Sequence, residues 1–215
     1  MTDIYVAVIG TEPWENSYSG DTNLYDIMNL ASSVWDTYIS DGSGDYSLWI
    51  DTISDRVPKS AIECDEDDCS NFDMRDRANK IDDWCQNNII YDYRDVIMVA
   101  DYFGDGDKTG VAQQTAATNK NKVAMEDYAK SLAPEWDNNL GHKGVNVHEL
   151  LHMFLDVANS SEHFPSVTYN YETTLMYSPD EVDSWCLKYT YITNVQDVVS
   201  DCTQSKVRNW IDNNL

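Results

Sequence analysis

Two histidines separated by three residues, with a glutamate beside the first, form the most informative pattern in this chain of 215 residues. The histidines are His148 and His152, and the glutamate is Glu149. Residues four apart in a helix lie on the same face, about 6 Å apart along the axis at a rise of about 1.5 Å per residue. Their imidazoles can therefore converge on one metal ion, with a carboxylate next to it.

The chemistry that this arrangement supports is hydrolysis by a zinc-activated water. A catalytic zinc takes three protein ligands and leaves its fourth position to water, whose pKa the metal lowers to about 7. Glu149 would then accept the proton of the water and pass it to the leaving amine. A structural interpretation also exists, because Asn146 and Glu149 match a capping box at a helix start. The chain has only four histidines, however, so two on one helical stripe favour the metal site.

The third zinc ligand is open on sequence grounds, and His163 is the first choice. Residues 159–161 can end the helix, so that the chain folds back and presents His163. Glu172 is the main rival, because another class of zinc hydrolase takes a carboxylate from further downstream. Asp156 lies on the histidine face, but about 12 Å along the axis from the first histidine. Glu162 completes the alternatives, and His142 reads as a loop residue.

Residues 148–177 resemble the active-site region of the metzincins, zinc endopeptidases with the pattern HExxHxxGxxH followed by a methionine-containing turn. His148 to His152 matches the opening, and residues 174–178, with the sequence TLMYS, resemble the Met-turn. The order of the upstream elements is also similar to the N-terminal lobe of that family. The resemblance implies a zinc-dependent endopeptidase in which Met176 lies beneath the metal.

The chain also departs from the metzincin pattern in the segment that should supply the third ligand. The family's glycine falls on Leu155 and its third histidine on Ala158, so His163 comes five positions late. We therefore expect the active-site helix to continue by about one turn, over 146–158, before the chain reverses.

Hydrophobic periodicity predicts an α+β fold with an α/β-like N-terminal lobe. Strands are expected at 4–9, 46–53, 96–100, 111–117 and 122–128, a loop at 58–70, and helices at 22–39, from Ser70 through Cys85, and from Val195 to Ile211. Strands alternating with helices favour a mixed, mostly parallel twisted sheet with covering helices. We expect one catalytic domain over 1–215, with a sheet lobe over 1–158 and an irregular, helical lobe over 159–215.

The net charge of −24 excludes some partners. It repels nucleic-acid phosphates and anionic membrane surfaces, and no apolar run is long enough to cross a membrane. Such acidity resembles that of proteins from extreme halophiles, which suggests an extracellular or virus-particle location in high salt. A cytoplasmic location is the alternative, because the sequence shows no signal peptide. The spaced aspartates of 104–107 could hold calcium or form a plain turn.

Five cysteines allow two disulfides and leave one thiol over. Cys64 with Cys69 and Cys186 with Cys202 are plausible pairs, although connectivity cannot be deduced from sequence.

The sequence therefore predicts a zinc endopeptidase that binds a peptide or protein substrate along an edge strand within 111–117. The alternatives are a zinc hydrolase that uses Glu172 and a non-catalytic, metal-containing structural or binding component, for example of a halophile surface or virus particle.

Overall fold

The structure of the chain is a computed structural model that describes residues 2–18, 24–40, 44–63, 73–102, 110–113, 122–127, 145–155, 172–173, 194–195, 199 and 201–215. Its strands are β1 (Asp3–Thr11), β2 (Ser47–Val57), β3 (Val96–Asp101), β4 (Gly110–Ala112), β5 (Val123–Asp127), β6 (Glu172–Thr173) and β7 (Asn194–Val195). Its helices are α1 (Glu12–Tyr18), α2 (Leu24–Tyr38), α3 (Lys59–Ile62), α4 (Met74–Asn88), α6 (Val145–His152) and α7 (Asp201–Asn214).

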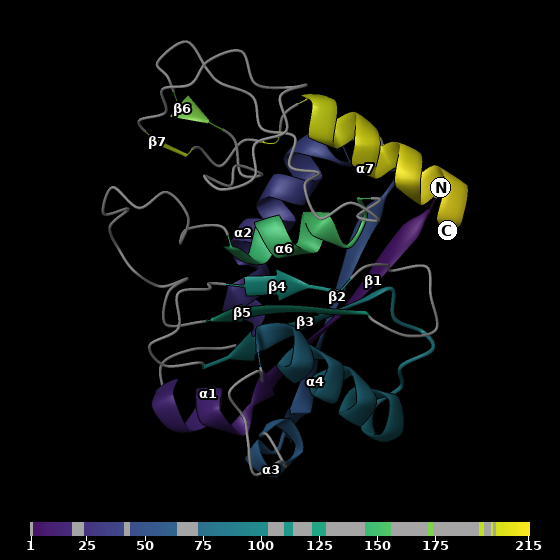
Figure 1. The fold of residues 1–215 in the computed structure, drawn as a ribbon. Coiled ribbons are helices and arrows are strands. Elements are labelled where there is room, and N and C mark those ends of the chain that lie inside the picture. Colours follow the sequence, from purple (N-terminus) through teal and green to yellow (C-terminus); the bar gives the residue numbers. More distant parts are fainter. Residues whose placement is uncertain are drawn as a thin grey trace.

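A five-stranded sheet in the order β2-β1-β3-β5-β4 forms the centre of the molecule (Figure 1). The neighbours from β2 to β5 pair in parallel, whereas β4 runs antiparallel to β5 at one edge. The short strands β6 and β7 form a separate two-stranded pair. The predicted α+β fold with a mixed, mostly parallel sheet is therefore confirmed.

Helices cover both faces of the sheet, which makes three layers (Figure 1). Alternate residues of each parallel strand point to opposite faces, so each strand contributes to two apolar clusters. On one face, Val6 and Met98 pack in a cluster with residues of α2, α6 and α7. On the other face, Ile9 and Val99 pack in a cluster with residues of α3 and α4. The central strands β1 and β3 read as nearly continuous apolar runs because both of their faces are buried.

The structure corrects the predicted start of the second long helix. The helix α4 begins at Met74, and its N-cap is Asp73 instead of Ser70. The Asp73 carboxylate accepts hydrogen bonds from the backbone N–H groups of Arg75 and Asp76, and the Asp76 side chain reaches back to the N-cap. The sequence contains two overlapping capping patterns, Ser70 with Asp73 and Asp73 with Asp76. In the structure, the second pattern satisfies free N–H groups of the first turn.

Three other segments differ from the sequence-based expectation. The predicted loop 58–70 contains the one-turn helix α3, which Ile62 anchors in the core. The helix α1 was not predicted, because among its described side chains only Trp14 lies in the core clusters. Val195 lies in β7 and not in the closing helix, whose described residues begin at Asp201. Short elements of this kind are stabilised by tertiary contacts, and their own periodicity is too weak to predict them.

None of the helices in the described part of the chain combines the length and the apolar character that crossing a membrane requires.

Cys85 is a free and fully buried thiol on α4. Loss of solvation, and secondarily the negative charge of Asp82, raise the pKa of the Cys85 thiol to about 12. The proposed pairs Cys64–Cys69 and Cys186–Cys202 involve side chains outside the described residues.

We expect Cys85 to resist iodoacetamide at pH 8 in the native protein, because alkylation needs the thiolate and access to it. Peptide mapping by mass spectrometry should find Cys85 unmodified under native conditions and fully modified in 6 M guanidinium. Rapid native alkylation of Cys85 would contradict its burial.

Candidate metal centre

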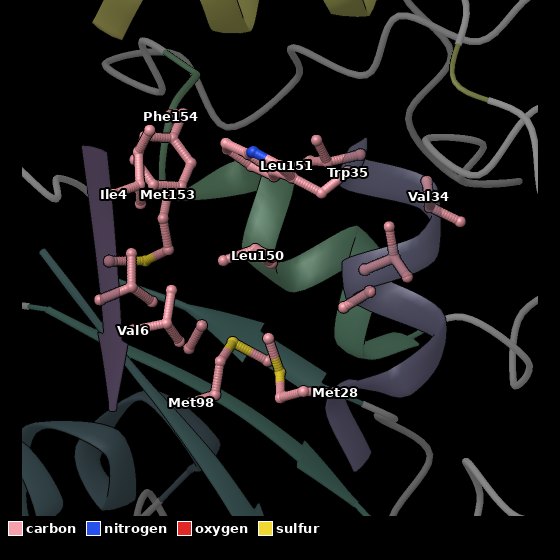
Figure 2. Packing of buried hydrophobic residues seen from close by; sticks show 14 of the residues in the cluster. Ile4, Val6, Met28, Val34, Trp35, Met98, Leu150, Leu151, Met153 and Phe154 are labelled. Carbon is pink, nitrogen blue, oxygen red and sulfur yellow. The ribbon is translucent and has the colours of Figure 1, made fainter. Parts of the chain in front are cut away.

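The helix α6 lies on the sheet face that it shares with α2 and packs against α2, β4 and β5 (Figure 1). Val147, Leu150 and Leu151 are buried in the cluster on that face. Figure 2 shows Leu150 and Leu151 between the strands and the side chains of α2. The apolar stripe fixes the rotation of α6 about its axis, and it leaves His148 and His152 half-buried, with their rings together.

The two histidine rings converge as the sequence predicts. The Nε2 atoms of His148 and His152 are 3.0 Å apart, and the ring centroids are 4.6 Å apart with an interplanar angle of 75°. Two nitrogens at about 2.0–2.1 Å from a tetrahedral zinc lie about 3.3–3.4 Å from each other. A widening of a few tenths of an ångström therefore suffices for both imidazoles to bind one ion, so the pair fits zinc.

The same contact is also a hydrogen bond when no ion is bound. One neutral imidazole then donates its Nε2–H to the unprotonated Nε2 of the other, and the tautomers decide which ring donates. Metal binding would replace this hydrogen bond by two coordinate bonds with little movement of either ring. The geometry is thus close to that of a preformed bidentate site.

Glu149 is buried, with 7% of its surface exposed, directly after the first histidine. The structure weakens the capping interpretation of this residue, because α6 begins at Val145 and Asn146 lies inside its first turn. The Asn146 Oδ1 atom accepts a hydrogen bond of 2.7 Å from the backbone N–H of Val147. Asn146 therefore does not occupy the N-cap position that a capping box with Glu149 requires.

The α-helix ends at His152, which corrects the predicted helix over 146–158. The next three residues form tight turns, in which the N–H groups of Met153, Phe154 and Leu155 donate to carbonyls three residues earlier, at 3.1, 3.0 and 3.3 Å. Such bonds often replace the α-helical pattern in a last turn. The α-helix thus ends nearly two turns earlier than we expected, at the second histidine.

The other predicted site residues cannot be placed. His163, Met176, Asp156 and Glu162 lie outside the described residues, as do His142 and the acidic turn 104–107. The backbone of Glu172 opens β6, but its side chain is not described. In the parts of the chain that the structure describes, no group of three or more His, Cys, Asp or Glu residues is arranged to hold a metal ion. Of the candidate site, the structure thus describes the two converging histidines, His148 and His152, and the adjacent Glu149.

Among the strands that the structure describes, β4 is the last at one edge of the central sheet, and it lies beside α6. The edge strand β4 (Gly110–Ala112) packs against α6, and it pairs on its inner side with β5. Gln113 extends this pairing, since its backbone N–H donates to the carbonyl of Val123 at 2.8 Å. β4 thus overlaps the predicted strand 111–117 at Val111 and Ala112.

No protein-family model matches the chain, and none of the curated proteins matches it either. Among solved structures, a similar chain occurs in a structure of a chaperone-substrate complex, with 12% sequence identity and a TM-score of 0.54. The match covers 99% of this chain and 35% of that chain, so this chain spans about a third of its length. A likeness at this level of identity concerns the fold alone.

Proposed function

We propose that the protein is a zinc-dependent endopeptidase of metzincin-like type. The observation that carries the proposal is the 3.0 Å approach of the His148 and His152 Nε2 atoms, with the buried carboxylate of Glu149 one residue after the first. Two converging imidazoles on one helix, with a glutamate directly after the first histidine, match the sequence pattern of a hydrolytic zinc centre. The chain has only four histidines, which makes this placement of two of them more telling.

In this proposal, each residue of the centre has a separate task. His148 and His152 hold the ion, and His163 is the preferred third ligand, ahead of Glu172. A zinc ion held there would supply polarisation of the scissile carbonyl and a bound water whose pKa is lowered to about 7. Glu149 accepts the proton of that water and later donates it to the leaving amine, and burial protects this carboxylate from bulk solvent. Met176 is the methionine of the Met-turn that the metzincin resemblance implies.

The edge strand β4 supports a peptide or protein as substrate. A strand at a sheet edge offers unpaired backbone groups, to which an extended peptide can add as a further strand. Because β4 also packs against α6, a peptide paired to β4 would run close to the histidine-bearing helix.

The net charge of −24 supports a high-salt environment, extracellular or on a virus particle, because salt screens the mutual repulsion of the acidic groups. A salt-rich cytoplasm would have the same effect. Assays should therefore contain molar concentrations of salt.

The metal content of histidine variants tests the proposal directly. We expect the purified protein to bind about one zinc per chain, and His148→Asn or His152→Asn to weaken zinc binding at least about 100-fold, since each removes one of the few ligands. The matched control is His142→Asn, which should bind zinc like the parent protein. His163→Asn tests the third ligand in the same series.

Two outcomes would count against the peptidase. If the parent protein and both ligand variants bind zinc equally well, His148 and His152 are not zinc ligands and the proposed metal centre is refuted. Stoichiometric zinc without hydrolysis of any peptide in a broad panel at high salt would favour the non-catalytic component instead.

A further inference from the structure

Phe154 links the candidate metal centre to the rest of the core. It lies two residues after His152, and its ring is fully buried. Its backbone N–H donates to the carbonyl of Leu151 at 3.0 Å, within the tight turns that end α6. Figure 2 shows the ring close to Ile4 of β1. The buried Phe154 is therefore separated from the second histidine by a single residue, Met153.

Two tryptophans from distant parts of the chain hold the Phe154 ring. Trp35 of α2 meets it edge to face at a centroid distance of 5.2 Å and an angle of 61°. Trp210 of α7 meets it at 5.7 Å and 76°. Edge-to-face pairs of this kind stabilise the packing of aromatic rings beyond the effect of burial alone. We call Trp35, Phe154 and Trp210 the aromatic clasp.

Hydrogen bonds fix both tryptophan-bearing helices relative to each other. The Arg208 guanidinium of α7 donates to the carbonyls of Ile39 and Tyr38 at the end of α2, at 2.8 and 2.7 Å. These are carbonyls that a helix end leaves without intrahelical partners. The hydroxyl of Tyr46 donates to Asp212 at 2.8 Å, and the Trp35 indole donates to the Tyr46 carbonyl at 2.7 Å. These hydrogen bonds connect the two helices, α2 and α7, that carry the tryptophans of the clasp.

A metal ligand at a helix end needs such support. Helix ends fray, and the second ligand of the pair is the last residue of α6. Zinc affinity depends on holding its ligands in place, and groups that orient the ligands contribute about 10–100-fold to it. The aromatic clasp contains Phe154, two residues after this end of the helix, and it includes neither histidine.

We propose that the aromatic clasp positions His152, so that zinc affinity depends on the docking of the C-terminal helix α7 through Trp210. The inference rests on the proposed zinc site and assigns Trp35, Phe154 and Trp210 as positioning residues. The end of the chain thereby controls the metal centre through packing alone.

The test compares Trp210→Ala with the rescue variant Trp210→Phe and with Ile81→Ala as the matched control. Ile81 is fully buried on the opposite face of the sheet, so its truncation destabilises the fold without touching the clasp. We expect Trp210→Ala to weaken zinc binding about 10-fold or more, and Trp210→Phe and Ile81→Ala to stay within about threefold of the parent. Competition with a chelator measures the affinity.

Hydrogen exchange supplies a readout that needs no metal. In Trp210→Ala, the amides of 153–155 should exchange at least about 10-fold faster than in the parent protein, whereas in Ile81→Ala they should stay within about threefold of the parent. If Trp210→Ala does not fold, Phe154→Leu removes both ring contacts at a smaller loss of volume and is expected to give the same pattern.

The outcomes separate this inference from the proposed function. Normal zinc affinity in folded Trp210→Ala and Phe154→Leu, or an equal loss in Ile81→Ala, would overturn the clasp and leave the zinc site intact. If the parent protein binds no zinc, the proposed zinc site is wrong. Selective deprotection of the 153–155 amides in Trp210→Ala would then still show that α7 holds the end of α6 in place through packing.

Discussion

Glu149→Gln is expected to lower the rate of peptide hydrolysis by about 10²–10⁴-fold while zinc remains bound. The amide has nearly the same shape as the carboxylate, so the buried position next to His148 stays filled. It cannot accept the proton of the attacking water, however, and a positioned general base contributes an acceleration of this size. The expected pattern is a loss in kcat with little change in metal content.

Peptide hydrolysis and metal analysis of the same preparation measure this effect. Glu63→Gln is the matched control, because it makes the same chemical change at an exposed residue that pairs with Lys59. Both activities should be compared at equal zinc occupancy. Undiminished hydrolysis by Glu149→Gln would refute its role as the base, and loss of zinc would indicate a structural role for the carboxylate.

Asp101→Asn is expected to lower the free energy of unfolding by about 2–4 kcal/mol. The Asp101 carboxylate is fully buried at the end of β3 and receives both guanidinium donors of Arg77 on α4, one at 3.0 Å. It also accepts from the Thr11 hydroxyl at the end of β1 and from the backbone N–H of Tyr102 at 2.8 Å. The asparagine would leave a poorly solvated cation without its counter-charge.

Urea unfolding measures the change, which should appear as a lower midpoint at an unchanged slope. Asp83→Asn, at an exposed position of α4, is the control and should shift the free energy by less than about 0.5 kcal/mol. Combining Arg77→Met with Asp101→Asn should cost less than the sum of the two single changes, because the uncompensated charge is then absent. Strict additivity would show that the two groups do not depend on each other.

Most of the sheet lobe was predictable because its pattern is local. The apolar runs at 4–9 and 96–100 became β1 and β3, and the helical spacing over 22–39 became α2. The apolar stripe of α6 was equally clear, and it turned His148 and His152 to one side as expected. Each of these features follows from periodicity within a single element.

Element ends were harder to predict, and the candidate site depends on one of them. The tight turns after α6 place the end of the helix at His152, whereas its polar and apolar pattern continues through 158. The cap at Asp73 was missed for the same reason, since several nearby residues could cap the helix. Local patterns leave such choices nearly equal in energy, and contacts with the rest of the chain select one.

By itself, the sequence determined the fold class and the helix that carries His148, Glu149 and His152, whereas zinc as the ion of that helix stays a prediction. Only the tertiary structure decided that β4 is a sheet edge beside that helix, that Asp101 pairs with Arg77, and that Trp35 and Trp210 grip Phe154. The reason is physical: a helix repeats about every four residues, so residues close together in the sequence determine which side chains share a face. Contacts between residues far apart in the chain leave no such repeat, and they form only when the whole core packs.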